Sequence, residues 1–145
     1  MELLFFAYRD FTSDADAVLA HYHFGRAHHR VLHFVHRNPG LRVAELLEIL
    51  RITKQSLSRV LKQLIDEGFI CQKASDSDGR ARLLHTTEKG CDLAELLIDL
   101  QLRRISKALG EAGVQSQSTI EAFLLGMIDD RDHPHVSSLK RSDNV

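Results

Sequence analysis

Residues 53–68 read TKQSLSRVLKQLIDEG, a pattern that predicts one short amphipathic helix. Thr53 is a residue type that caps helix N-termini, and Gly68 is a residue type that commonly follows their C-termini. Between them, apolar residues recur at the i, i+3, i+4, i+7 and i+8 spacing of one helix face, and they are Leu57, Val60, Leu61, Leu64 and Ile65. The opposite face is short, polar and basic and contains Lys54, Gln55, Ser56, Ser58, Arg59 and Lys62.

The polar face of this helix has the chemistry of a helix that lies in the major groove of DNA. Amide and guanidinium groups make bidentate contacts with base edges, whereas hydroxyl and ammonium groups reach phosphates. We therefore assign base readout to Gln55, Ser56 and Arg59, and phosphate contacts chiefly to Lys54 and Lys62.

The segments around this helix predict a helix-turn-helix followed by a β-hairpin. Before it, a turn at Asn38–Gly40 leads to a short helix at Val43–Leu50 and a break at Arg51–Ile52. After it, Phe69–Ala74 and Arg80–Thr86 predict a pair of strands joined by a turn-rich segment.

The hairpin tip is cationic, because Arg80 and Arg82 lie at or beside it. Guanidinium groups at the end of a two-stranded ribbon can enter a narrow minor groove, where the negative potential is enhanced. Asp78 is placed to accept a hydrogen bond from one of these arginines. We expect the tip to grip DNA beside the site that the helix reads.

Six motifs follow one another between residues 25 and 95, namely Pro39-Gly40-Leu41, Val43-Ala44-Glu45-Leu46, Thr53 to Arg59, Leu64 to Ile70, Asp78-Gly79-Arg80 and Thr87-Glu88-Lys89-Gly90. In this order they resemble the winged helix-turn-helix of MarR-type bacterial transcriptional regulators. Two positions depart from the family pattern. Gly79 stands where a second basic residue is common, and Arg42 stands where a capping Ser or Thr is common, which leaves that helix cap unassigned.

The resemblance implies a homodimeric, sequence-specific regulator that binds a palindromic operator in double-stranded DNA and is modulated by a small-molecule effector. It implies no cofactor or metal. The DNA-binding residues are then Thr53, Lys54, Gln55, Ser56, Ser58, Arg59, Lys62, Asp78, Arg80 and Arg82. The effector pocket is expected between the winged module and the dimer helices, near Tyr22, Phe24, His28 and Arg30.

The fold class is mainly α with a small β-hairpin wing, flanked by N- and C-terminal dimerisation helices. The expected segments are N-terminal helices at 1–38, the winged module at 39–89, C-terminal helices at 90–131 and a flexible tail at 132–145. Leu3 to Tyr22 predicts one helix or two, because Thr12 to Asp16 is able to cap a new start. Arg26 to Arg37 predicts another helix.

The apolar faces of the flanking helices need a partner. They lie at Leu3–Phe11, Leu93–Leu109 and Ile120–Ile128, and a small winged module cannot cover all of them. Pairing with a second copy across a two-fold axis buries them economically. An intramolecular helical bundle is the alternative.

Composition agrees with a DNA-binding protein of the cytoplasm. The 145 residues carry a net charge of −1, which excludes a nonspecific polycation. Residues 51–90 nevertheless hold eight Lys/Arg and five Asp/Glu, a net charge of +3. Residues 91–130 hold three Lys/Arg and seven Asp/Glu, a net charge of −4. The apolar run near Met1 is too short for a signal peptide or a membrane span, and Glu2 replaces the basic residues of a signal.

Other functions have weaker support in the sequence. His29, His33 and His36 stand at i, i+4 and i+7 within a histidine-rich segment, which suggests a metal site, an effector contact or a pH sensor, but one helix rarely closes a metal site. Cys71 and Cys91 suggest redox sensing, although a structural role fits their surroundings better. No catalytic motif is present. A metal- or redox-responsive regulator of the same fold, a winged-helix protein-interaction module and a His-metal enzyme are the alternatives.

Overall fold

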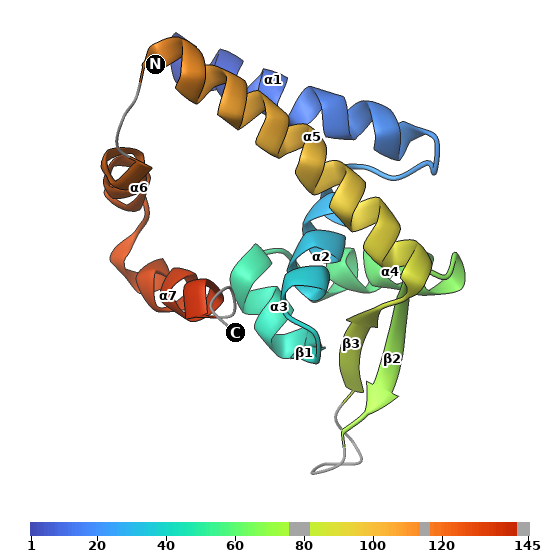
Figure 1. Cartoon of the computed structure of the whole chain (residues 1–145). Helices are drawn as coiled ribbons and strands as arrows, with labels where there is room; N and C mark the ends of the chain where they lie inside the picture. The colour runs from blue at the N-terminus through green and yellow to red at the C-terminus, as the bar shows by residue number, and fades with distance from the viewer. Residues whose placement is uncertain (76–81, 114–116, 142–145) are drawn as a thin grey trace. The chain divides into compact units, whose positions relative to one another are not determined.

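The structure is a computed structural model that describes residues 1–75, 82–113 and 117–141, without the side chains of 117 and 138–141 (Figure 1). The chain divides into two compact units, which we call unit 1, Met1–Leu102, and unit 2, Arg103–Val145. The predicted fold class, mainly α with a small β wing, is confirmed.

Two helices begin unit 1. Helix α1, Glu2–Ala20, is continuous, so the possible second start at Thr12 is not used. The Thr12 hydroxyl instead donates to main-chain carbonyls of its own helix, those of Tyr8 at 3.1 Å and Arg9 at 3.0 Å. Helix α2, Arg26–Arg37, has the predicted bounds.

The helix-turn-helix consists of α3, Val43–Leu50, and α4, Lys54–Asp66. Thr53 caps α4 as predicted, because its hydroxyl accepts the Ser56 N–H at 3.1 Å. Gly68 follows the helix with φ +77°, a left-handed conformation that glycine adopts readily. The unassigned cap of α3 is supplied by Glu45, whose Oε2 accepts the Arg42 N–H at 2.8 Å.

The wing belongs to a sheet of three antiparallel strands in the order β1-β3-β2, where a pair was predicted. Strand β2, Ile70–Ala74, pairs along its length with β3, Arg82–Thr86. The added strand is β1, Leu41–Arg42, which pairs with Leu84 and Leu83 on the other side of β3. Two residues are too few to show strand periodicity in a sequence. The predicted tip residues Asp78 and Arg80 lie outside the described residues.

One hydrophobic core runs through unit 1 and joins α1 and α2 to the helix-turn-helix, the sheet and the start of α5, Glu88–Ala112. Its fully buried large side chains are Phe69, Leu19, Leu32, Leu46, Leu57, Leu64, Ile70, Leu84, Leu97, Val31 and Val35. Helix α5 crosses the chain closely at Gly90, where an added Cβ would lie 1.9 Å from the carbonyl oxygen of Phe69. Only glycine permits this crossing, which holds α5 against the end of α4.

Unit 2 contains the end of α5, helix α6, Gln117–Leu125, a 3₁₀ turn at Asp130–Asp132 and helix α7, His133–Arg141. The sequence predicted a flexible tail after Asp132, and α7 differs from that prediction. This segment has few apolar residues, so the periodicity that reveals other helices is weak here. Among the helices that the structure describes, none combines the length and apolar content needed to cross a membrane.

Candidate nucleic-acid interface

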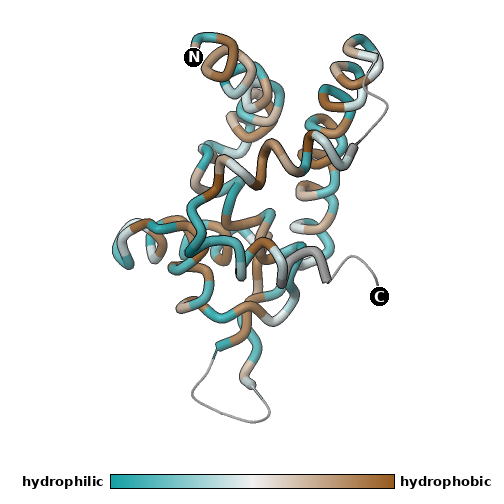
Figure 2. The backbone as a smooth tube through the Cα atoms, turned by 90° about the vertical axis from the view of Figure 1, so that its left-hand side faces the viewer, coloured by the Kyte–Doolittle hydropathy of each residue, from teal (hydrophilic) through white to brown (hydrophobic). Residues whose placement is uncertain are grey.

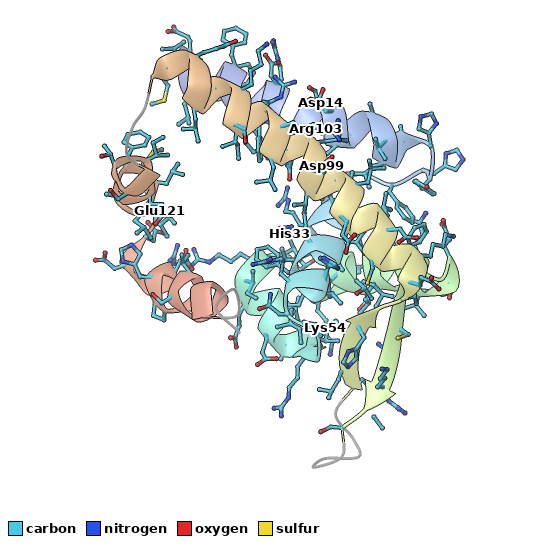
Figure 3. All side chains as sticks on the ribbon, viewed as in Figure 1. Asp14, His33, Lys54, Asp99, Arg103 and Glu121 are labelled. Carbon is cyan, nitrogen blue, oxygen red and sulfur yellow. The ribbon has the colours of Figure 1, made fainter. Side chains whose placement is uncertain are left out.

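Helix α4 presents an accessible polar face. The side chains of Lys54, Gln55, Ser56, Ser58, Arg59 and Lys62 are all exposed. The helix is anchored by its other face, where Leu57, Val60, Leu61 and Leu64 are buried. Figure 3 labels Lys54, which marks the N-terminal end of this helix. The residues proposed to read DNA are therefore brought together on one face, as a groove-binding helix requires.

The N-terminal end of α4 is held in place by two hydroxyl groups. Thr53 Oγ1 accepts the Ser56 N–H and donates to Ser56 Oγ at 2.9 Å. This arrangement leaves the Ser56 hydroxyl hydrogen available to an acceptor outside the protein. The end of the helix also carries the positive end of the helix dipole, which favours phosphate.

Near the other end of α4, Lys62 forms an ion pair with Asp66 one turn later. Both side chains are exposed, so the pair is weak and solvent-screened. Breaking this pair costs little, so the Lys62 ammonium is accessible to another anion.

Arg82 is the one predicted wing residue within the described part of the chain. It is exposed at the first position of β3, opposite Ala74. The neighbouring strand adds Lys73, an exposed cation that the sequence analysis missed. Burial falls from Ile70 to Ala74 without alternating, so strand periodicity did not mark Lys73. Its basic side chain within a predicted wing strand was the available signal.

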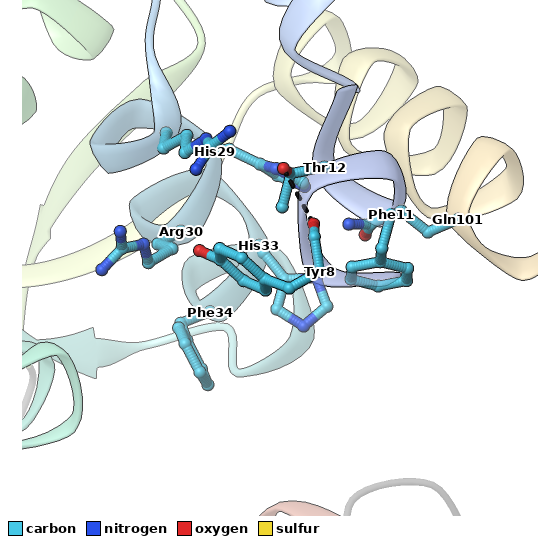
Figure 4. A pocket seen from close by; sticks show the side chains of 9 residues that line it. Tyr8, Phe11, Thr12, His29, Arg30, His33, Phe34 and Gln101 are labelled. Atoms are coloured by element: carbon cyan, nitrogen blue, oxygen red, sulfur yellow. Dashed lines mark hydrogen bonds between the residues drawn. The ribbon is translucent and has the colours of Figure 1, made fainter. Parts of the chain in front are cut away.

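A pocket of about 310 Å³ lies between the N-terminal helices and α5 within unit 1 (Figure 4). It is lined by Tyr8, Phe11 and Thr12 of α1, by Arg26, His29, Arg30, His33 and Phe34 of α2, and by Gln101 of α5. Of the four predicted effector residues, Arg30 lines this pocket. The aromatic residues of α1 were missed because they come together with α2 only in the folded chain.

The polar groups around the pocket differ in charge. Arg26 Nε donates to Asp16 Oδ2 at 2.9 Å, and this bond raises the pKa of the guanidinium. Burial lowers the pKa of His33 to about 4, helped by the charges of His29, Arg37 and His36. Burial likewise lowers the pKa of His29, against the opposing effect of Asp16. Both imidazoles are therefore neutral at pH 7.

Arg30 differs from Arg26 because it has no ion-pair partner within the part of the chain that the structure describes. Its exposed guanidinium is a positive charge at the pocket with which no carboxylate of the described residues forms an ion pair. Together with the aromatic side chains of Tyr8, Phe11 and Phe34, it forms a lining suited to a small organic anion.

The other three predicted effector residues form an aromatic cluster around Phe69. The Tyr22 and Phe24 rings lie 5.3 Å and 5.1 Å from the Phe69 ring, both edge to face. The His28 ring stacks on Phe24 at 4.7 Å. This cluster connects the N-terminal helices to the junction between α4 and the wing.

The surroundings of the histidine-rich segment and of the two cysteines bear on the metal and redox hypotheses. Among the residues described, no three His, Cys, Asp or Glu side chains are grouped so as to hold a metal ion. His29 and His33 line the pocket, whereas His36 is turned into the protein. Cys71 and Cys91 are half-buried free thiols, and Cys91 Sγ lies 3.1 Å from Thr86 Oγ1.

The fold and the exposed face of α4 define a winged helix-turn-helix protein. A family model for the MarR family matches residues 24–81. The HTH-type transcriptional regulator PetP of Rhodobacter capsulatus is 44% identical over 140 residues, which are 97% of this chain and 84% of that protein. The chain belongs to the MarR family. It is a DNA-binding transcriptional regulator and not an enzyme.

Solved structures share the fold. A MarR family transcriptional regulator of Listeria monocytogenes, in complex with a 26mer DNA, has a TM-score of 0.73 at 21% identity, over 97% of this chain and 93% of that chain. A MarR family protein of Mycobacterium tuberculosis, in complex with salicylic acid, has a TM-score of 0.57 at 23% identity, over 86% and 90%. At these identities the likeness concerns the fold alone.

Proposed function

We propose that the protein is a homodimeric, sequence-specific regulator that reads a palindromic operator with α4. The observation that carries this proposal is the separation of the two faces of α4. One face consists of four buried aliphatic side chains, and the other presents amide, hydroxyl, guanidinium and ammonium groups to solvent. Such a helix is fixed in orientation by the core and open to a major groove. The regulator works where the DNA is, in the cytoplasm.

The face divides into two chemical roles. Gln55, Ser56 and Arg59 contact base edges, because their side chains offer paired or directional hydrogen bonds. Lys54 and Lys62 contact phosphates, with Thr53 and Ser58 beside them. The Listeria structure, which was solved with DNA, supports the use of this fold on a duplex.

The wing adds a second contact in this proposal. Arg82 and Lys73 are exposed cations on the paired strands. Asp78 and Arg80 lie outside the described residues, and their role stays a prediction from the sequence. The wing cations enter or flank the minor groove next to the site of α4.

A second copy of the chain covers the apolar side chains that each unit leaves exposed. In unit 1 they include a run on α1 made of Leu3, Leu4, Phe5, Phe6 and Tyr8. Brown, the colour of hydrophobic residues, is prominent near the N-terminal end of the tube in Figure 2. In unit 2 the exposed apolar side chains include Ile105, Phe123, Leu124 and Met127. Single exposed apolar residues are ordinary on protein surfaces, but a run of this kind along one helix indicates an interface.

The pocket beside α2 binds the effector, a small organic anion whose carboxylate pairs with Arg30. Salicylate is a suitable probe, because the related Mycobacterium protein was solved with salicylic acid. Titration calorimetry is expected to show binding to the wild type and loss of binding in Arg30→Gln. The control is Arg42→Gln, which removes an exposed arginine that does not line the pocket. Equal binding by Arg30→Gln and the wild type contradicts this site.

Genome-wide binding followed by fluorescence anisotropy tests the main proposal. Aligned binding sites should give a palindrome with half-sites roughly 34 Å apart along the helix. The operator duplex should bind on the order of 10³-fold more tightly than a random duplex of equal length, with affinity falling steeply as salt rises. Equal affinity for the two duplexes contradicts sequence-specific reading.

A further inference from the structure

His28 makes two directional hydrogen bonds that connect α2 to α4. Its Nδ1 lies 3.1 Å from the Gly25 nitrogen, and a main-chain N–H can only donate, so Nδ1 accepts. The ring hydrogen is consequently on Nε2, which lies 2.9 Å from Gln63 Oε1 and donates to it. The tautomer of His28 is thus determined by the cap of its own helix.

Gln63 continues the same chain of hydrogen bonds along α4. Its Nε2 donates to Glu67 Oε1 at 2.9 Å, at the last residue before Gly68. In the Gln63 amide the oxygen therefore acts as acceptor and the nitrogen as donor, and the two roles cannot be exchanged. Rotating the amide by 180° would direct its NH₂ group at the N–H of His28 and its oxygen at the Glu67 carboxylate.

The plane of the His28 ring is held by packing. The ring is stacked on Phe24 with an interplanar angle of 8°, and Phe24 is buried against Phe69. The direction in which Nε2–H points is therefore set by the core and not by a flexible side chain.

We propose that His28 is a positioning residue for DNA recognition, which acts through Gln63 to hold α4 at one axial position relative to α2. This inference rests on the proposed role of α4 as the reading helix. The apolar contacts between the two helices stabilise their packing but do not fix one position along the helix axis, because the hydrophobic effect is non-directional. A hydrogen bond, in contrast, is strong only in a narrow range of distance and angle. Gln63 lies one helical turn after Arg59, so a shift at Gln63 displaces the proposed base contact.

Two substitutions at His28 separate this role from simple helix capping. Glu and Gln at this position of a helix both accept the main-chain N–H of the cap residue. Only Gln also has an N–H group to donate to Gln63 Oε1, whereas Glu directs an acceptor at an acceptor. His28→Gln therefore keeps both bonds, and His28→Glu keeps the cap alone.

The measurement is the ratio of operator affinity to random-duplex affinity, taken by anisotropy on the full chain at one salt concentration. The ratio corrects for the added charge of Glu. We expect His28→Gln to keep the wild-type ratio and His28→Glu to lower it roughly tenfold, with similar thermal unfolding of both variants. In a Gln63→Met background the two His28 variants should have equal ratios, because the acceptor that distinguishes them is gone.

A wild-type ratio in His28→Glu overturns the inference, and so does an equal loss in His28→Gln and His28→Glu. Arg59→Ala separates this result from a failure of the proposed function. If Arg59→Ala lowers the ratio and His28→Glu does not, α4 reads DNA and His28 has no positioning role. If Arg59→Ala and Gln55→Ala both leave the ratio unchanged, α4 is not the reading helix and both proposals are wrong.

Discussion

The winged module of unit 1 and the whole of unit 2 differ in how far their apolar side chains are buried. In the winged module, residues 39–89, the helices α3 and α4 and the strands β2 and β3 each contribute fully buried large residues, among them Leu46, Leu57 and Leu84. In unit 2, none of the described side chains is buried, and Phe123 and Met127 remain 64% and 52% exposed. The first region belongs to the single core of unit 1, whereas the described residues of unit 2 include apolar side chains without a core.

This difference shows which parts of the chain bury their apolar side chains within a single copy. A buried core accounts for the stability of the winged module, because removing apolar area from water is the main favourable contribution to folding. Unit 2 lacks that contribution within one copy, as does the start of α1, where Leu3 is 86% exposed. The proposed dimer resolves the contrast by covering both.

The largest expected effect is on the proposed interface. Phe123→Asp combined with Met127→Asp places two charges on an exposed surface, which a monomer tolerates. Burying them in a dimer costs about 3 to 5 kcal/mol of association free energy. Analytical ultracentrifugation should show dimers for the wild type and monomers for the double variant, whose operator binding is also weakened.

The matched control for this pair is Phe123→Leu combined with Met127→Leu, which keeps the surface apolar and should remain dimeric. A wild type that sediments as a monomer at micromolar concentration and still binds a palindrome tightly would contradict the proposed dimer.

The next effect tests the core of unit 1. Gly90→Ala places a Cβ 1.9 Å from the Phe69 carbonyl oxygen, which is main chain and cannot move aside alone. We expect a loss of about 3 kcal/mol in the free energy of unfolding, measured in urea. Gly110→Ala is the control in the same helix, with no atom within 4 Å of the added Cβ, and should gain about 0.5 to 1 kcal/mol. Equal stabilities of the two variants would show that the crossing of α5 is not tight.

The third prediction separates function from stability within the winged module. Arg59 is exposed, so Arg59→Ala should leave the free energy of unfolding unchanged. It should weaken operator binding by about 1 to 3 kcal/mol and relax preference at one base pair in each half-site. Lys62→Ala should instead weaken all duplexes alike and reduce the salt dependence. The proposed division of roles is wrong if both variants lose affinity uniformly.

The smallest effect concerns the pocket beside α2. His33 has a pKa near 4 in the folded chain, below the value of about 6.5 for an unfolded histidine. Above pH 6.5 both states are neutral at this residue and no stability depends on it. As pH falls from about 6.5 to 4 the unfolded chain takes up the proton first, and the fold loses about 1 to 2 kcal/mol after allowance for solvent screening.

Urea unfolding at a series of pH values measures this loss for the wild type and for His33→Gln. The difference between the two proteins isolates His33 from the carboxylates that titrate in the same range. Parallel pH profiles would mean that His33 is not desolvated by the pocket.

Local signals account for most of what could be predicted about the fold. The cap at Thr53, the left-handed Gly68 and the 3.6-residue spacing between them act within a few residues, so the sequence alone predicted α4 and its polar face. The same holds for α2, whose bounds were predicted to the residue. Strand β1 was missed because its pairing with β3 joins residues more than forty positions apart.

The sequence by itself determined the class of protein, the bounds of α4 and the residues on its exposed face, because caps, turns and helix periodicity are local properties of the chain. Only the tertiary structure decided which side chains meet across helices. It brought Tyr8 and Phe11 of α1 to Arg30 and His33 of α2 to form the pocket. It also gave His28 its bond to Gln63, 35 positions later in the chain. Contacts of that kind depend on how whole helices pack, and no short pattern of residues records them.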